Sequence, residues 1–329
     1  MTGRFCTTCG WRLDDRHRFT VQFDANDRGV VVSSNINITE KAYAKVNLTL
    51  EILGKRRDGY HNLASVMQTV DLYDTVSITE SDEIVVSCDD EQITPEINLA
   101  TKAANVLRER SGVAMGAQIA IEKNIPVSAG LGGGSTDAAA TLRGLNKLWN
   151  LGLSMDELTE IAADIGSDVP FLVCGGTSLV QGRGEDVTPV AAAKIPKFLI
   201  LTPKVDLENP TAKTASVFAH VNESMFTRGN LTHKLAARIR TGGDCPPEFF
   251  FNQFGVLAET LFPGWGSQRD KLMSLGARDV ILCGAGPSMF TIPPSKELGT
   301  AWHLLLTTIH GLNAYLVDPA PAIPESKKP

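Results

Sequence analysis

The order of apolar and polar positions along the chain predicts a mixture of strands and helices. Partly alternating segments and short apolar runs, rich in strand-forming residues, predict strands. These segments are Ala42–Leu53, Val66–Thr79, Ile84–Cys88, Ala117–Glu122, Phe171–Cys174, Lys197–Leu201, Val280–Cys283, Met289–Ile292 and Ala314–Val317. Apolar residues three and four positions apart predict helices. The predicted helices are Leu99–Glu109, Ala138–Trp149, Ser154–Ile165, Thr211–Val221, Leu231–Arg240, Phe254–Leu261 and Trp302–Ile309.

The two kinds of element are mixed without regular strand–helix–strand alternation, which favours the α+β class over a doubly wound sheet. Residues 1–38 carry clustered charges and no sustained period, so we expect a leader outside the main fold. The Pro- and Lys-rich residues 318–329 are expected to form a solvated tail. Between these ends we expect an N-terminal domain over 39–196 and a C-terminal domain over 197–317.

Composition sets limits on the kind of partner. The chain has 329 residues, a net charge of −6 and a pI of about 5.6, which argue against nucleic-acid binding by overall charge. It has no apolar run of the roughly 18 residues needed to cross a membrane. The sequence starts without a signal-peptide pattern, so we expect a cytoplasmic protein. An anionic ligand must then be held by local groups.

Cysteines are scattered along the chain at positions 6, 9, 88, 174, 245 and 283. This spread is typical of a reducing compartment without structural disulfides. Cys6 and Cys9 form a C-x-x-C pair, but a structural zinc site needs four ligands and His17 is the only further candidate nearby. We therefore predict no zinc site in the leader.

One segment stands out for its chemistry. Residues Pro126–Ala140 read P-V-S-A-G-L-G-G-G-S-T-D-A-A-A and lead directly into the predicted helix. Glycines let backbone N–H groups approach an anion, and the start of a helix adds its unpaired N–H groups and positive dipole end. Ser135 and Thr136 add hydroxyl donors. The segment is not a Walker A loop, because no lysine precedes Ser135. It predicts a cradle for polyphosphate, although a glycine-rich loop without a ligand is the alternative.

Several separated motifs resemble those of the GHMP kinase superfamily. Besides the glycine-rich loop they are Ala44–Leu48, Arg57–His61, Gly166–Pro170, Gln181–Glu185 and Cys283–Phe290, which stand in family order over residues 41–317. The likeness is strongest to members that phosphorylate the 2-hydroxyl of a cytidine-diphosphate-linked methylerythritol in non-mevalonate isoprenoid synthesis. The resemblance implies a two-domain fold with the active site in the interdomain cleft. It also implies ATP and Mg²⁺ as cofactors.

The resemblance assigns catalytic roles to two residues that are distant in sequence. Asp168 matches the family's catalytic aspartate, which accepts the proton of the acceptor hydroxyl. Lys45 matches the lysine beside it, whose charge favours negative charge developing on the attacking oxygen. Asn47 matches a substrate contact on the same strand face as Lys45, because side chains alternate with period two.

The remaining assignments divide between the two substrates. Tyr60 and His61 match the cytidine pocket, where a ring stacks on the base and an imidazole binds its polar edge. The other substrate-binding positions implied are Thr214, Phe218, Gly284 and Gly286. The ATP-binding positions implied are Asn98, Lys123, Pro126, Ala129, Gly130, Leu131, Gly132, Gly133, Gly134, Ser135 and Thr136. The metal ligands stay unassigned.

Two alternatives remain open from the sequence. The first is another GHMP kinase, acting on homoserine, mevalonate or a sugar, which the adjacent Tyr60 and His61 argue against. The second is a catalytically silent member that binds a metabolite, which the presence of both Lys45 and Asp168 argues against. The sequence does not decide the oligomeric state.

Overall fold

The computed structural model describes residues 17–23, 30–205 and 213–324. The strands are β1 (His17–Phe23), β2 (Val30–Lys55), β3 (His61–Ser81), β4 (Ile84–Cys88), β5 (Gly116–Glu122), β6 (Thr177–Gly182), β7 (Asp186–Pro189), β8 (Phe198–Thr202), β9 (Phe251–Asn252), β10 (Ile281–Leu282), β11 (Met289–Thr291) and β12 (Asn313–Val317). The α-helices are α1 (Leu99–Ser111), α2 (Gly133–Leu148), α3 (Met155–Ala162), α4 (Val169–Cys174), α5 (Lys213–Ala219), α6 (Asn230–Arg240), α7 (Ala258–Leu261), α8 (Trp265–Ser274) and α9 (Lys296–Leu304). Shorter helical turns are η1 (Glu223–Met225), η2 (Pro247–Phe249), η3 (Gln253–Leu257) and the π-helical turn η4 (Leu305–Ile309).

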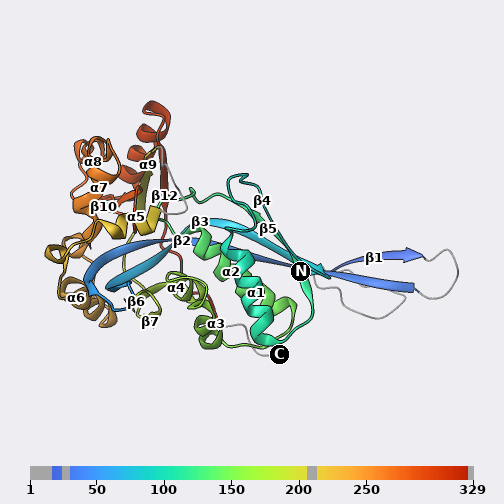
Figure 1. Ribbon diagram of the computed structural model, residues 1–329. Coiled ribbons are helices and arrows are strands. Elements are labelled where there is room, and N and C mark those ends of the chain that lie inside the picture. The colour runs from blue at the N-terminus through green and yellow to red at the C-terminus, as the bar shows by residue number, and fades with distance from the viewer. Residues whose placement is uncertain (1–16, 24–29, 206–212, 325–329) are drawn as a thin grey trace.

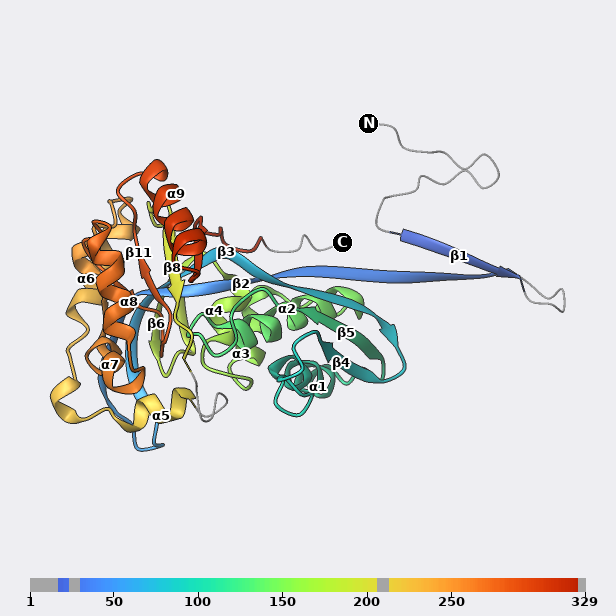
Figure 2. The same ribbon diagram turned by 90° about the horizontal axis from the view of Figure 1, so that it is seen from above.

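A large sheet runs through the molecule along two long antiparallel strands, β2 and β3. Its order is β1-β2-β3-β5-β4, with β6 and β7 added beside β3 and β9 beside β2. Strands β1 and the first part of β2 form a hairpin that projects from the rest of the protein (Figures 1 and 2). Helices α1 to α4 lie together near one half of this sheet, while α5 to α9 lie at the other end of the molecule (Figures 1 and 2).

A second sheet of order β10-β11-β8-β12 forms the centre of the C-terminal half. Its strand β8 is buried at every position, and its apolar side chains alternate between two cores. Phe198 and Ile200 pack into the core shared with β2, whereas Leu199 and Leu201 pack into the core under the C-terminal helices. Both faces of the sheet are therefore covered, which explains why residues Phe198–Leu201 are all apolar.

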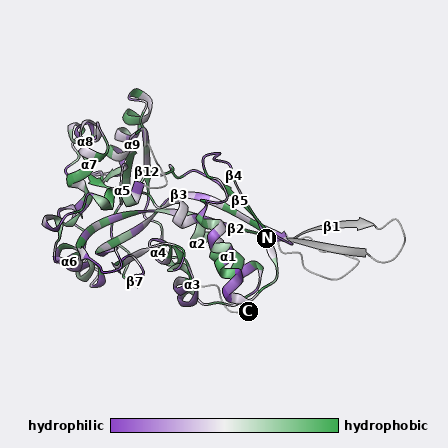
Figure 3. Cartoon of the chain, in the orientation of Figure 1, coloured by the Kyte–Doolittle hydropathy of each residue, from purple (hydrophilic) through white to green (hydrophobic). Residues whose placement is uncertain are grey.

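Strand β2 alternates along its inner part between apolar and polar residues, and both sets are buried. Ala44, Val46 and Leu48 enter the core shared with the second sheet. Lys45 and Asn47 lie on the opposite side, also buried, where the strand pairing with β3 shifts register near Tyr43 and again after Asn47. The ribbon of β2 and β3 accordingly carries bands of both hydropathy colours (Figure 3). Such bulges are common next to functional sites, because they redirect side chains.

The mixed α+β class is confirmed, but the predicted strand Phe171–Cys174 is wrong, because the segment forms helix α4. Periodicity cannot separate a short apolar run in a strand from one in a buried helix. Pro170 in the first turn, after Asp168 at the N-cap, is the signal that indicates a helix start. The predicted helix from Ser154 is confirmed at its start, where Ser154 and Glu157 form a capping box with both reciprocal hydrogen bonds present.

The expected leader and tail are both partly incorporated into the fold. Residues 30–38 belong to β2, and Ile36 and Ile38 pack against the core between the large sheet and helices α1 to α4, which we call the first core. The expected solvated tail instead packs against the rest of the protein as far as Ile323. The N–H of Ile323 donates to Cys174 O at 2.8 Å, and Ala320 is buried. Alternating Ile36 and Ile38 between polar residues is the pattern that indicates a strand there. Cys6 and Cys9 lie outside the described residues.

Candidate active site

The glycine-rich loop joins β5 to α2 and surrounds the amino end of that helix. Gly130 and Gly132 have φ values of +84° and +78°, which L-residues with a side chain rarely adopt. Gly132 is the N-cap of α2, and among the described residues no side chain caps this helix. The first N–H groups of α2 are therefore open to an anion, as a phosphate cradle requires.

The two predicted hydroxyl donors differ in access. Thr136 is almost fully buried, with 1% of its surface exposed, whereas Ser135 is half-buried. Ser135 is therefore the hydroxyl of this pair that a ligand can reach. Pro126 lies half-buried at the start of the loop.

The glycine-rich loop packs backbone to backbone against the second glycine motif, Cys283–Phe290. A Cβ atom added at Gly130 would overlap the carbonyl oxygen of Cys283 and lie 2.8 Å from that of Gly286. The N–H of Ser288 donates to Ala129 O at 3.1 Å. Two motifs that are about 150 positions apart in the chain therefore form one continuous surface of glycines.

The predicted catalytic residues meet beside this surface. The Nζ of Lys45 lies 3.3 Å from a carboxylate oxygen of Asp168 and donates to Asn47 Oδ1 at 2.8 Å. Asn47 in turn donates to Ser65 Oγ at 2.9 Å, which fixes the orientation of its amide. The backbone N–H of Lys45 donates to Leu131 O at 2.9 Å, so the strand and the loop are joined directly. Lys45 is buried, whereas the Asp168 side chain is 31% exposed and open to a substrate.

The C-terminal glycines close the other side of the lysine. A Cβ added at Gly284, whose φ is +50°, would lie 3.0 Å from Lys45 Nζ. The carbonyl of Gly284 accepts from Asn252 Nδ2 at 2.8 Å, which holds the turn in place. The site is thus built from both halves of the chain.

The predicted acceptor-side residues are brought together only in part. His61 stacks on Phe218, with ring centroids 5.3 Å apart and an interplanar angle of 23°. Burial lowers the pKa of His61, which favours the neutral imidazole, a group that can both donate and accept. Tyr60 is 51% exposed and has the Arg183 guanidinium 5.4 Å from its ring centroid. Thr214 is exposed in the first turn of α5.

Two residues expected at the nucleotide have partners inside the protein. Lys123 Nζ lies 2.5 Å from Asp74 Oδ2 and 2.6 Å from Asp137 Oδ2. Burial raises the pKa of Asp137 above its usual range, with neighbouring Asp74 acting in the same direction and Lys123 against it. Asn98 is the N-cap of α1 and accepts from the N–H of Ala100. The nucleotide contacts of Asn98 and Lys123 stay predictions.

Sequence reasoning missed two buried charged residues at this site. Asp74 accepts from the N–H groups of Asn124 and Ile125, so it anchors the chain that leads into the glycine-rich loop. Lys213 reaches the loop from α5. Neither residue belongs to a motif with a recognisable spacing, and their positions depend on tertiary packing alone.

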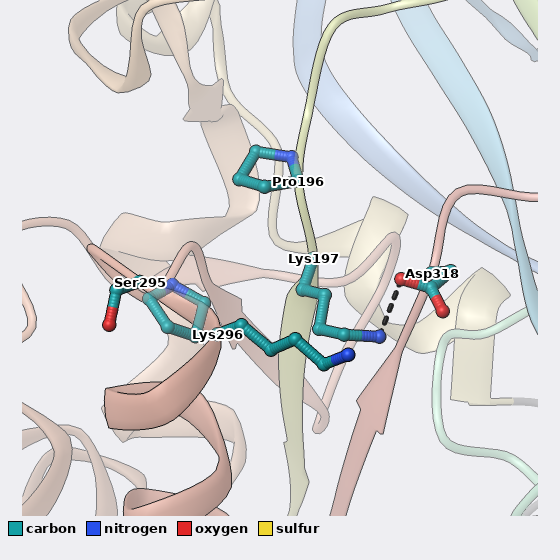
Figure 4. Close-up of a pocket in the computed structure, with 6 residues that line it drawn as sticks. Pro196, Lys197, Ser295, Lys296 and Asp318 are labelled. Atoms are coloured by element: carbon teal, nitrogen blue, oxygen red, sulfur yellow. Dashed lines mark hydrogen bonds and ion pairs between the residues drawn. The ribbon is translucent and has the colours of Figure 1, made fainter.

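The structure also contains two cavities outside these contacts. The one in Figure 4 is lined by Pro196, Lys197, Pro293, Ser295, Lys296 and Asp318, with Lys197 Nζ 2.5 Å from Asp318. The other, of about 420 Å³, is bordered by the bound tail around Ala320. Neither includes a predicted site residue.

No helix in the described part of the chain is long and apolar enough to span a membrane.

Comparison with known proteins gives consistent matches. Residues 98–176 match the family model of the GHMP kinase N-terminal domain. A 4-diphosphocytidyl-2-C-methyl-D-erythritol kinase from Dehalococcoides mccartyi is 39% identical over 282 residues, covering 85% of this chain and 98% of the relative. One from Caldicellulosiruptor saccharolyticus is 43% identical over 263 residues, covering 78% and 88%. A crystal structure of 4-(cytidine 5'-diphospho)-2C-methyl-D-erythritol kinase superposes with a TM-score of 0.70 at 28% identity, covering 85% of this chain and 98% of the other.

These matches, together with the fold, define a GHMP kinase, an ATP-dependent phosphotransferase that acts on a small molecule. The identities are well above the level at which only a fold is shared, and they extend over most of the chain. The chain belongs to the 4-diphosphocytidyl-2-C-methyl-D-erythritol kinase family.

Proposed function

We propose that this kinase transfers the γ-phosphoryl group of ATP to the 2-hydroxyl of 4-(cytidine 5'-diphospho)-2-C-methyl-D-erythritol. The observation that carries the proposal is the Lys45–Asp168 pair, 3.3 Å apart, beside the open amino end of α2. A carboxylate, an ammonium and a phosphate cradle at one place are the parts that phosphoryl transfer requires. The names of the relatives supply the identity of the acceptor.

Asp168 acts as the general base. Its partly exposed carboxylate accepts the proton of the acceptor hydroxyl while that oxygen bonds to the γ-phosphorus, and the bond from phosphorus to the bridging oxygen breaks to release ADP. Lys45 stabilises the negative charge on the attacking oxygen. Asn47 helps to orient the Lys45 ammonium, because its Oδ1 accepts one of the three protons.

The donor atoms present fit Mg²⁺, which prefers oxygen ligands and keeps several waters. Asp137 Oδ1 is buried and has no hydrogen-bond partner among the described residues. Ser135, two positions earlier at the start of α2, offers a hydroxyl. These two residues would hold the cation, which when bound neutralises charge on the ATP phosphates.

The acceptor's base is recognised by the aromatic residues of the N-terminal half together with Phe218. The His61–Phe218 stack supports a pocket for a flat ring, and exposed Tyr60 offers a further stacking face.

Among the described residues, the four cysteines Cys88, Cys174, Cys245 and Cys283 are all free, which supports a reducing, cytoplasmic location. We keep 39–196 and 197–317 as the proposed domains.

An assay of ADP formation tests the proposal. Wild-type protein is expected to turn over the cytidylyl acceptor only with Mg²⁺, and to leave homoserine and mevalonate unphosphorylated. Asp168→Asn is expected to lower kcat by about 10²–10⁴-fold, the usual contribution of a general base, with little change in the KM for ATP. Phosphorylation of homoserine or mevalonate, with no phosphorylation of the cytidylyl compound, would refute the proposed acceptor. Equal kcat of the two proteins would remove Asp168 from its role.

A further inference from the structure

A second lysine reaches the catalytic surface from the C-terminal half. Lys213 is the first residue of α5 and is 8% exposed. Its Nζ donates to Ser128 O at 2.7 Å and to the carbonyl oxygen of Gly286. The ammonium therefore lies where the start of the glycine-rich loop meets the C-terminal glycine turn.

In the part of the chain that the structure describes, the surroundings of Lys213 leave its charge uncompensated. Among the described residues no carboxylate forms an ion pair with it, and the charged or titratable groups that face it are Lys45 and Cys283. Burial, with a smaller contribution from Lys45, lowers the pKa of Lys213 to about 7, while burial raises that of Cys283 to about 12 and keeps the thiol neutral. A buried cation without a counter-charge is costly for a protein.

The other buried lysines of the site show the contrast. Lys123 contacts two carboxylates, and Lys45 contacts Asp168. Lys213 has only carbonyl oxygens, which occupy two of the three protons of an ammonium group. Its third proton and its whole charge are free for an anionic ligand, within the part of the chain that the structure describes.

We propose that Lys213 binds a phosphoryl oxygen of a bound substrate at the junction of the two glycine motifs. The inference rests on the proposed function for the identity of that substrate. Two sources share this chemistry: the terminal phosphates of ATP and the diphosphate of the cytidylyl acceptor. Either places negative charge against Lys213 and supplies a counter-charge that the described residues do not.

Matched variants test the proposal. Lys213→Met keeps the length of the side chain without the charge, Lys213→Arg keeps the charge, and Lys234→Met is the control at an exposed lysine on α6. Calorimetry measures the affinity of each protein for ATP and adenosine, and for CDP and cytidine. Lys213→Met loses one charged hydrogen bond. We therefore expect it to bind either ATP or CDP about tenfold to hundredfold more weakly than wild type, and to bind the matching nucleoside equally well. Lys213→Arg is expected to retain part of that affinity, and Lys234→Met all of it.

Which ligands lose affinity distinguishes the two sources of phosphate from a purely structural role of Lys213. Weaker ATP binding alone identifies the nucleotide phosphates, and weaker CDP binding alone identifies the acceptor diphosphate. If Lys213 only held the two glycine motifs together, adenosine or cytidine would lose affinity as much as ATP or CDP, and this result would overturn the proposal. Unchanged affinity for all four ligands would overturn it as well.

Proton uptake gives an independent measurement. A phosphate next to Lys213 raises the pKa of its ammonium, so at pH 8 a group that is mostly neutral in the free protein gains a proton on binding. Calorimetry in buffers of different ionisation enthalpy is expected to show this uptake in wild type and to show less in Lys213→Met. Equal uptake by both proteins would contradict the phosphate contact. The binding experiments need no turnover, so they remain decisive even if the proposed acceptor is wrong.

Discussion

Substitution of Gly130 by alanine tests whether the two glycine motifs form one surface. The backbone of Gly130 has a φ of +84°, and an added Cβ would overlap the Cys283 carbonyl and lie 2.8 Å from Gly286 O and 2.9 Å from Gly286 N. All three atoms belong to backbone, so none can move aside as the end of a flexible side chain can. The methyl group must therefore push the glycine-rich loop away from the C-terminal turn.

The expected magnitude has two parts. An alanine in the left-handed region costs about 1–2 kcal/mol, and forced overpacking adds about 1–3 kcal/mol. Gly264 offers a matched control, since its φ is +86° and nothing lies within 4 Å of its added Cβ. Gly264→Ala is therefore expected to lose only about 1–2 kcal/mol of unfolding free energy, against about 2–5 kcal/mol for Gly130→Ala.

Denaturant unfolding of the two variants and wild type measures the difference, and the KM for ATP reports the cradle. Gly130→Ala is expected to raise this KM because the displaced loop no longer presents its N–H groups at the start of α2, whereas Gly264→Ala leaves it unchanged. Equal losses of stability in the two variants, with an unchanged KM for ATP in both, would refute the packing of Gly130 against Cys283.

Two further changes give separate expectations. Tyr60→Ala removes an exposed ring and is expected to raise the KM for the acceptor by about tenfold or more, the usual value of one base stack, while the KM for ATP stays constant; a constant acceptor KM would argue against stacking. Ending the chain after Asp318 removes the hydrogen bonds from Ala320 N to Thr69 O and from Ile323 N to Cys174 O, both 2.8 Å long. At about 1 kcal/mol each, this predicts a measurably lower Tm, and an unchanged Tm would contradict a bound tail.

Local patterns predicted most of the elements and two important features of the site. The alternation in β2 places Lys45 and Asn47 on one face, and the structure joins them by a 2.8 Å hydrogen bond. The glycine run before α2 likewise predicts an open helix start, which the structure contains. These features depend on residues that are near one another in the chain, so period and composition are sufficient to identify them.

Features that depend on tertiary packing were missed or were wrong. The strand prediction for Phe171–Cys174 was wrong because Phe171, Leu172 and Val173 form a short buried apolar run, a pattern that a strand and a buried helix share. The tail is bound because the isolated bridges of Pro319 with Val70 and of Ala322 with Gly175 attach it to distant segments. The local sequence pattern of the tail does not indicate that these distant segments pair with it.

The lysines show most clearly what local sequence leaves undetermined. Lys45, Lys123 and Lys213 all contact the glycine-rich loop or the first turn of α2, yet their partners in the fold differ. Lys123 forms ion pairs with two carboxylates, Asp74 and Asp137. One exposed carboxylate shares the charge of Lys45, which leaves that pair able to serve a reacting hydroxyl. Among the described residues Lys213 contacts carbonyl groups and no carboxylate, so on our proposal its charge gains a strong partner when a phosphate binds, and substrate binding relieves a cost of the folded protein.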